Sequence, residues 1–155
     1  MSHNIEEIIQ KLLNESSPNE PNAQQLRALV EGEQKGPFHF LNLLAFKDKA
    51  EYPTDHALAG EELTGSEAYD KYGAVAFEQV VKRGGRLMTL ATVEKQLIGS
   101  DKHWDRIATM EYQHIDAFID MIVDPEYRAA LPHRDAGLKA TEVIVTRPII
   151  TSPVS

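Results

Sequence analysis

The segment Phe38–Phe46 (FHFLNLLAF) constrains the fold more than any other part of the chain. Apart from His39 and Asn42, hydrophobic residues occupy both alternations of this segment. A strand with one face in water alternates polar and hydrophobic residues, because successive side chains point to opposite faces. We therefore expect Phe38–Phe46 to be a strand whose two faces are both covered.

The next predicted element is a long helix that follows a polar loop over residues 47–63. Thr64 and Glu67 have the spacing of a capping box, which marks the start of a helix. The pair Gly84-Gly85 supplies the left-handed residue that commonly ends a helix. Between these signals, one helical face carries Tyr69, Tyr72, Ala76 and Val80.

Two strands, a second helical region and a last strand complete the pattern. Alternating residues predict strands over residues 86–97 and 104–112, which a Gly-Ser-Asp turn joins as an antiparallel hairpin. A short helix is predicted over residues 115–123, and Asp124-Pro125-Glu126 provides the N-cap and first turn of another helix. The β-branched residues within 141–146 predict the final strand.

The order strand, helix, strand, strand, helix, strand predicts an α+β fold, a ferredoxin-like βαββαβ sheet with both helices on one face. The other face of such a sheet has no cover, although the first strand is hydrophobic on that side too. Leaving several large side chains exposed costs about 1.5–3 kcal/mol each. We therefore expect a homodimer in which the uncovered faces of two sheets pack together.

Residues 1–36 predict a helical arm that precedes a single domain over residues 37–155. Hydrophobic residues at helical spacing over residues 5–13 indicate an amphipathic helix, and the prolines of residues 16–21 indicate a linker. Asn22 is the predicted N-cap of a second short helix. The arm competes with a second copy as a cover for the open sheet face. Its hydrophobic stripes are short, so we treat it as an accessory to the dimer.

The composition limits the partners of this domain. The chain has 16 Lys and Arg against 24 Asp and Glu, and its net charge of −8 repels nucleic acid and anionic lipid. It has no cysteine, which excludes disulfides, thiolate metal sites and cysteine nucleophiles. The first residues carry acids where a signal peptide needs bases, and no segment is hydrophobic enough to cross a bilayer. We expect a cytoplasmic protein that binds neither nucleic acid nor membranes.

Several short motifs occur in a fixed order between residues 38 and 147. They are residues 40–47 (FLNLLAFK), 65–69 (GSEAY) with Tyr72 and Gly73, 84–86 (GGR), 104–106 (WDR), 124–127 (DPEY), and Arg134. In this order they resemble an uncharacterised bacterial family, a domain of unknown function within the dimeric α/β-barrel superfamily. The resemblance implies a ferredoxin-like protomer that pairs into a closed barrel.

The superfamily that these motifs resemble contains cofactor-free monooxygenases, haem-degrading enzymes, isomerases and ligand-sensing domains, so the resemblance does not choose a reaction. The haem-degrading enzymes carry a tryptophan where this chain has Met121, and a haem-ligating histidine where it has Leu131. His133 lies two residues further on and faces another side of a helix. We therefore expect no haem-degrading activity and no cofactor, while haem binding through His133 stays open as an alternative.

The sheet contributes the first candidate site residues. Trp104, Arg106 and Tyr112 share one alternation of their predicted strand. Together they would form a wall with an aromatic surface, a cation and a phenol, which suits an aromatic or enolic small molecule. The alternative is a core tryptophan beside an arginine that pairs with a carboxylate. Asn42 either binds a ligand or bonds to a neighbouring loop, because a buried amide needs partners.

The helices contribute the remaining candidates. Tyr72 would donate a hydrogen bond to a developing oxyanion, or it packs with its hydroxyl at the rim. Tyr127, His133 and Arg134 would close the open end of a pocket, and His133 titrates near neutral pH. We predict His133, Arg106 and Tyr72 as catalytic residues. The predicted substrate-binding residues are Asn42, Trp104, Tyr112, Tyr127, Arg134 and Arg86.

Two functions fit these residues, and a structural dimer without a pocket is a third interpretation. One function is cofactor-independent oxygenation or isomerisation of an aromatic or enolic compound. In that reaction Arg106, Asn42 and Tyr72 would polarise an enolate, Trp104 would stack on it, and His133 would exchange the proton. The other function is that of a non-catalytic dimer that binds or senses a small organic ligand. We expect no metal site, because the six histidines are scattered and no pair is spaced i, i+4.

Overall fold

The computed structural model of the chain describes residues 4–14, 17, 19–32, 36–99 and 101–150. The strands are β1 (Phe38–Phe46), β2 (Arg86–Thr92), β3 (Arg106–Tyr112) and β4 (Leu138–Thr146). The helices are α1 (Ile5–Asn14), α2 (Ala23–Glu31), α3 (Gly65–Lys82), α4 (Ile115–Ile122) and α5 (Pro125–Gly137). Helices and strands therefore follow one another in the order that the sequence predicts.

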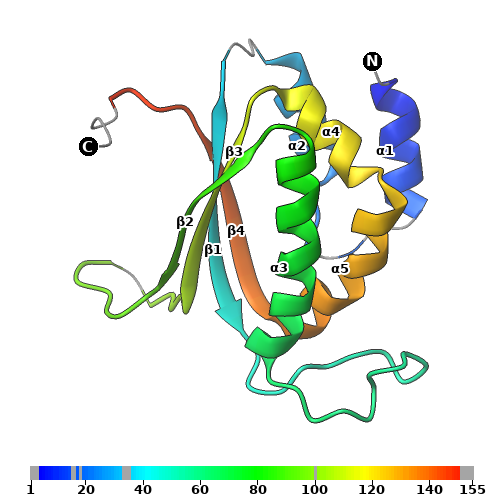
Figure 1. The fold of residues 1–155 in the computed structure, drawn as a ribbon, viewed down its shortest axis with the longest axis vertical. Helices are drawn as coiled ribbons and strands as arrows, with labels where there is room; N and C mark the ends of the chain where they lie inside the picture. Colours follow the sequence, from blue (N-terminus) through cyan, green and yellow to red (C-terminus); the bar gives the residue numbers. More distant parts are fainter. Residues whose placement is uncertain (1–3, 15–16, 18, 33–35, 100, 151–155) are drawn as a thin grey trace.

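The four strands form one antiparallel sheet in the order β2-β3-β1-β4. Helices α3, α4 and α5 lie on one side of the sheet, which we name the helix face, and the opposite side is the open face (Figure 1). This arrangement confirms the ferredoxin-like α+β prediction. β1 is an inner strand, and its Leu44 is fully buried on the helix face while Leu41 and Leu43 lie half-buried on the open face.

The helix ends follow the predicted local signals. Thr64 and Glu67 form a capping box at the start of α3, and Asn22 caps α2 in the same way. Asp124 caps α5 by accepting a hydrogen bond from a backbone N–H of its first turn. After α3, Gly84 has φ +80°, which an L-residue with a side chain rarely adopts.

The connection between β2 and β3 is longer than predicted. β2 ends at Thr92 rather than at residue 97, and β3 begins at Arg106 rather than at residue 104. The connecting loop spans residues 93–105, of which residue 100, in the predicted Gly-Ser-Asp turn, lies outside the described residues. Asp105 turns towards β1 at this point: its N–H donates to the carbonyl of Leu44, and its carboxylate accepts from the N–H of Phe46. The carbonyl of Asp105 also accepts a hydrogen bond from the N–H of Val93, so the chain keeps backbone bonds to both neighbouring strands just before β3 begins.

The junction between α5 and β4 has no loop, so β4 begins at Leu138 rather than at residue 141. A Cβ atom on Gly65 would lie 2.1 Å from the carbonyl oxygen of Lys47, and one on Gly137 would lie 2.3 Å from that of Gly65. The N–H of Lys47 donates to the carbonyl of Gly137, and the N–H of Gly65 donates to that of Lys47. Glycine is required here because the start of α3, the end of α5 and the chain after β1 meet without room for side chains.

The N-terminal arm consists of the two predicted helices and packs against the domain. Ile9 of α1 and Leu26 of α2 are each 2% exposed. Between the helices, Ser17 Oγ and Asn19 Nδ2 both donate to Asp135 of α5. The arm is therefore tied to the outer helix of the domain by a hydrophobic stripe and by polar contacts. The predicted boundary at residue 36 stays a prediction.

Candidate functional site

A cavity of about 1250 Å³ lies between the helix face of the sheet and the helices. Its walls come from all four strands, from α3, α4 and α5, and from α1 and α2 of the arm. The volume is enough for an organic molecule of several rings. Six of the nine predicted site residues line the cavity: Asn42, Tyr72, Arg106, Tyr112, Tyr127 and Arg134.

The cavity exists because the helices cover the inner strands better than the edge strands. Val143 of β4 pairs with Asn42 of β1, and Leu90 of β2 pairs with Ala108 of β3, so both hydrophobic side chains point to the helix face. Nevertheless, Val143 is 43% exposed and Leu90 is 59% exposed. Hydrophobic side chains of the cavity wall therefore remain exposed to solvent along both edges of the sheet.

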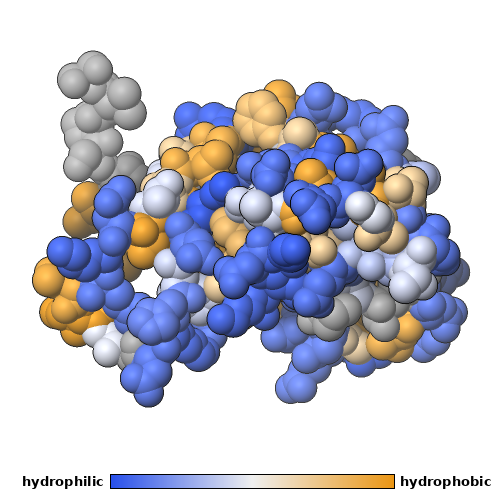
Figure 2. Space-filling view, turned by 90° about the horizontal axis from the view of Figure 1, so that it is seen from below, coloured by the Kyte–Doolittle hydropathy of each residue, from blue (hydrophilic) through white to orange (hydrophobic). Residues whose placement is uncertain are grey.

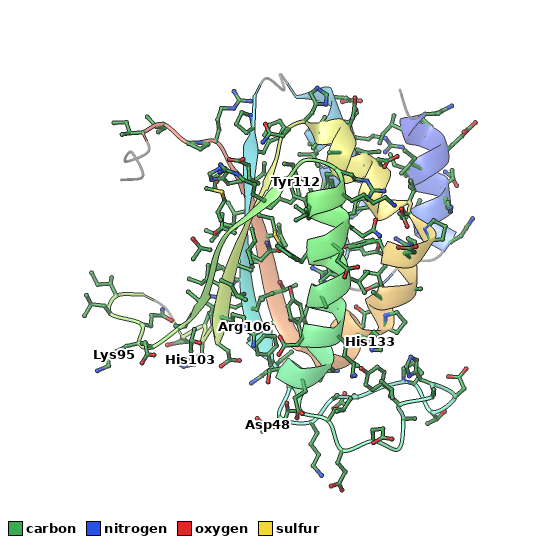
Figure 3. All side chains as sticks on the ribbon, viewed as in Figure 1. Asp48, Lys95, His103, Arg106, Tyr112 and His133 are labelled. Carbon is green, nitrogen blue, oxygen red and sulfur yellow. The ribbon has the colours of Figure 1, made fainter. Side chains whose placement is uncertain are left out.

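Arg106 reaches the cavity from the first residue of β3. Its Nη1 lies 2.6 Å from a carboxylate oxygen of Asp70 on α3, and its guanidinium lies over the ring of Phe46, with 4.8 Å from Cζ to the ring centroid. Figure 3 shows Arg106 and Tyr112 between the sheet and α3. The charge of this arginine is therefore neutralised within the protein, by an aspartate that directly follows Tyr69 and that sequence reasoning missed.

Tyrosines form the polar part of the cavity wall beneath α3 and α5. The hydroxyl oxygens of Tyr72 and Tyr127 lie 2.9 Å apart and are buried. Burial raises the pKa of the Tyr127 hydroxyl well above its usual value, and burial likewise raises the pKa values of Tyr69 and Tyr112. These three phenols stay protonated at neutral pH, so each can donate a hydrogen bond.

Arg134 lies on the inner side of α5 and is 7% exposed. Its Nη1 donates to the backbone carbonyl of Asn19, in the linker of the arm. Its guanidinium is 5.5 Å from the ring centroid of Tyr72, and its Nε is buried without a hydrogen-bond partner. Within the described residues, no carboxylate pairs with this cation.

Asn42 combines both of the roles that the sequence allows. Its Nδ2 donates to the backbone carbonyls of Phe40 and Ala108, at 3.1 and 3.0 Å, so its amide group braces β1 and β3. The residue also lines the cavity. Its amide hydrogens are used by the sheet, and its side-chain oxygen is the atom with capacity for a ligand donor.

Trp104 does not share a wall with Arg106 and Tyr112, which corrects the sequence prediction. It lies before β3 begins, in the loop over residues 93–105, and it lines a separate hollow of about 350 Å³ with Leu43 and Ile107 on the open face. The alternation of side chains holds only within a strand. Since residue 104 lies outside β3, the alternation of the strand does not determine which face its side chain points to.

Arg86 also lies away from the cavity, on the open face. It makes a two-point ion pair with Glu111, at 3.0 and 3.2 Å, and His39 Nε2 lies 2.9 Å from the same carboxylate. Glu111 is 5% exposed. The Arg86 guanidinium lowers the pKa of Glu111, and His39 also lowers it, against the opposing effect of burial. These three residues, which we name the open-face cluster, neutralise one another.

His133 is not positioned to act as a base in the cavity. It points to the outer side of α5, away from the sheet (Figure 3). Its Nδ1 lies 2.7 Å from the hydroxyl of Tyr52, and the ring of His56 lies 5.7 Å away, both in the loop over residues 47–63. Burial lowers the pKa of His133, and the charges of His56 and Lys71 lower it further. His133 therefore fastens a loop to α5.

The described residues contain no group of three His, Asp or Glu side chains that could hold a metal ion. In the same part of the chain, no helix is long and hydrophobic enough to span a bilayer. The polar residues that line the cavity are two arginines, the tyrosines, Asp70 and Asn42, together with Asn19, Glu20, Gln25, Thr141 and Glu142.

A family model matches residues 56–148, which lie within the predicted domain and include three of the four strands and helices α3 to α5. The chain thus belongs to a family described as a domain of unknown function (DUF1330). This result confirms the resemblance inferred from the motifs. Among curated proteins, none matches the sequence.

Solved structures of one relative cover most of the chain. RPA0582, a protein of unknown function from Rhodopseudomonas palustris, is 32% identical, with 88% of this chain and 100% of that chain covered and a TM-score of 0.76. Its methylated form is 33% identical, with 86% and 96% covered and the same TM-score. A dimeric protein with a ferredoxin-like fold from Bacteroides fragilis is 12% identical, with 73% and 97% covered. Its TM-score of 0.40 is too low to support an argument.

Proposed function

We propose that this protein binds a small organic molecule, aromatic or enolic in character, in the cavity between the helix face and the helices. The single observation that carries the proposal is that the cavity places two arginines and a buried tyrosine pair inside a largely hydrophobic wall. Ligand sites commonly have this composition, with a few polar groups that orient the ligand within a hydrophobic surface.

Binding or sensing is favoured over catalysis. Cofactor-independent oxygenation or isomerisation requires a group that accepts a proton from the ligand. His133, the predicted base, faces the loop over residues 47–63 instead of the cavity. Arg106, which was predicted to polarise the enolate, is paired with Asp70. Both observations reduce the support for the enzymatic interpretation of the same site.

We also propose that the protein is a homodimer formed through the open face. That face carries Leu41, Leu43 and Ile107, and Ile144, which pairs with Leu41, is 45% exposed. The loop over residues 93–105 projects on the same side of the sheet (Figure 1). In Figure 2, hydrophobic atoms gather on the lobe that projects on this side, and Leu97 and Ile98 of the loop are about nine-tenths exposed.

A second copy is the occupant that fits this surface best. The open face is hydrophobic around a cluster whose charges are already neutralised, so it offers little to a charged partner. A twofold axis would let the projecting loop of each copy reach beside the sheet of the other. The exposed hydrophobic residues of both copies would then be covered together.

Native mass spectrometry of the freshly purified protein tests both parts of the proposal. We expect a dimer mass that increases by one ligand per chain, either as purified or after incubation with a panel of aromatic and enolic compounds. Ala108→Phe would fill the cavity from β3 and abolish this binding, whereas Ala57→Phe, at an exposed position of the loop, would leave it unchanged.

Each part of the proposal can fail separately in this experiment. If no compound binds, or if Ala108→Phe binds as well as the wild type, the cavity is not a ligand site. If the mass is that of a single chain at micromolar concentration, the homodimer is wrong, whatever the outcome for the ligand.

A further inference from the structure

We propose that Arg134 binds the carboxylate of the ligand, so that the natural ligand is an organic acid. This inference rests on the proposed ligand cavity and specifies the chemical class that it takes.

The first argument is the lack of a counter-charge. A guanidinium remains charged at any physiological pH, and a buried charge is costly unless it is paired. Arg134 is 7% exposed, yet no carboxylate among the described residues pairs with it. The neighbouring Asp135 is engaged instead with Ser17 and Asn19. The buried Arg134 guanidinium therefore lacks the carboxylate partner that a buried cation normally has.

The second argument is the unsatisfied donor. The described part of the chain satisfies Arg134 through Nη1 alone, which donates to the carbonyl of Asn19, while Nε is buried and unpartnered. A backbone carbonyl presents one oxygen and no net charge, whereas a carboxylate presents two oxygens and a full negative charge. A ligand carboxylate that takes the place of this carbonyl would satisfy more donors of the same guanidinium and neutralise it.

The third argument comes from the groups around Arg134. The ring of Tyr72 stacks near the guanidinium, and the Tyr72 and Tyr127 hydroxyls form a buried pair that can donate to a second carboxylate oxygen. Beyond them the cavity wall is hydrophobic, through residues such as Phe40 and Met121. A polar end and a hydrophobic body match an acid group attached to a ring system.

The other arginine of the cavity provides a matched comparison. Arg106 lines the same cavity but pairs with Asp70 at 2.6 Å. Because its charge is already neutralised, it has much less to gain from a ligand carboxylate. The inference therefore assigns the recognition of the acid group to Arg134 and not to Arg106.

Isothermal titration of a matched pair of probes tests this assignment. The probes are 2-naphthoate and 2-naphthamide, which share a ring system and differ in the charge of the head group. We expect the wild type to bind the acid at least tenfold more tightly than the amide. Arg134→Met should reduce the affinity for the acid to that for the amide and leave the amide unchanged. Arg27→Met, which removes an exposed arginine of α2 outside the cavity, should keep the preference within threefold of the wild-type value.

The possible outcomes separate the carboxylate site from the cavity itself. If the wild type binds the amide as well as the acid, or if Arg134→Met keeps the preference, Arg134 is not the acid site although the cavity still binds ligands. If neither probe binds, the carboxylate site and the ligand cavity both fail. If Arg134→Met does not fold, Arg134→Lys tests the same assignment. It keeps the charge but loses the planar fork, so we expect an intermediate preference, and a wild-type preference would contradict the proposal.

Discussion

The buried charged residues on the two sides of the sheet differ in how completely their hydrogen bonds and charges are satisfied. On the open face, Glu111 is held by Arg86 and His39, so the open-face cluster satisfies its own charges and hydrogen bonds. On the helix face, Arg134 is equally buried but has one carbonyl partner and an unpartnered Nε. A cluster whose charges and hydrogen bonds are all satisfied within the protein stabilises the fold or an interface. A buried charge with an unsatisfied donor instead indicates a position where a ligand supplies the missing partner.

The contrast extends to the hydrophobic residues on each face. On the helix face, side chains such as Leu90 and Val143 border a cavity that lies between the sheet and the helices and is open along the sheet edges. On the open face, Leu41, Leu43 and Ile107 form a broad surface. A concave hydrophobic surface fits a small ligand, and a sheet face without helices over it fits a second protein chain.

The largest effect is expected from a charge placed on the open face. Leu43→Asp would bury a carboxylate twice in a symmetric dimer, since each copy contributes the same residue. We expect the dimer dissociation constant to rise at least 100-fold, about 3 kcal/mol, in analytical ultracentrifugation. Leu13→Asp, which makes the same change at an exposed position of α1, should leave the dimer intact. An unchanged dimer in Leu43→Asp would mean that the open face is not the interface.

A smaller effect is expected within the open-face cluster. Glu111→Gln keeps the shape of the side chain but removes the charge that holds Arg86 and His39. Hydrogen bonds to charged groups contribute about 1.5–3 kcal/mol, and the exposure of Arg86 lowers the expected loss to about 1–2 kcal/mol. Urea unfolding measures this loss. A variant as stable as the wild type would show that the cluster is not a stabilising element.

The same carboxylate predicts the response to acid. Because the pKa of Glu111 in the folded protein is lowered from its ordinary value of 4.5, its contribution to stability is present above about pH 4.5 and is lost as the pH falls further. Unfolding free energies measured between pH 6 and pH 3 should therefore fall more steeply for the wild type than for Glu111→Gln. Parallel pH profiles would contradict this assignment.

The loop over residues 47–63 should respond more weakly. Tyr52→Phe removes the hydroxyl that bonds to His133 Nδ1, at an expected cost of about 0.5–1.5 kcal/mol. Hydrogen exchange should become faster in this loop, while the affinity for 2-naphthoate stays within twofold of the wild type. A large loss of affinity would place the loop at the ligand site, against the position of His133 outside the cavity.

The smallest effect on stability is expected from replacing Arg134, the buried cation that has no carboxylate partner among the described residues. Replacing a buried charge with a hydrophobic residue of similar size is often neutral or stabilising. Arg134→Met should therefore change the free energy of unfolding of the ligand-free protein by less than about 1 kcal/mol, or increase it. A loss of more than about 3 kcal/mol would identify Arg134 as a structural residue, held mainly by its bond to Asn19.

The fold could be predicted from local signals that agree with one another. The two-sided hydrophobicity of Phe38–Phe46 corresponds to an inner strand, and the signals at Thr64, Gly84 and Asp124 lie at helix ends. Strand boundaries were predicted less well. The bonds of Asp105 to β1 and the direct passage of α5 into β4 depend on contacts between distant residues, which a local pattern does not contain.

The candidate site was predicted in part, and its errors have specific causes. Successive residues on a helix point about 100° apart, so His133 and Arg134 could not both face the cavity, and the sequence does not show which one does. Trp104 was assigned to a strand that begins two residues later. The carbonyl of Asn19 on Arg134 had no signal at all, because any residue supplies a backbone carbonyl.

The most direct test of the different roles of the two faces is a methyl NMR titration with 2-naphthoate. Met110 and Met121 line the cavity, whereas Leu43 and Ile107 lie on the open face. We expect saturable shifts at the two methionine methyl groups, and no shifts at Leu43 and Ile107. Shifts confined to Leu43 and Ile107 would place the ligand on the open face and contradict the account.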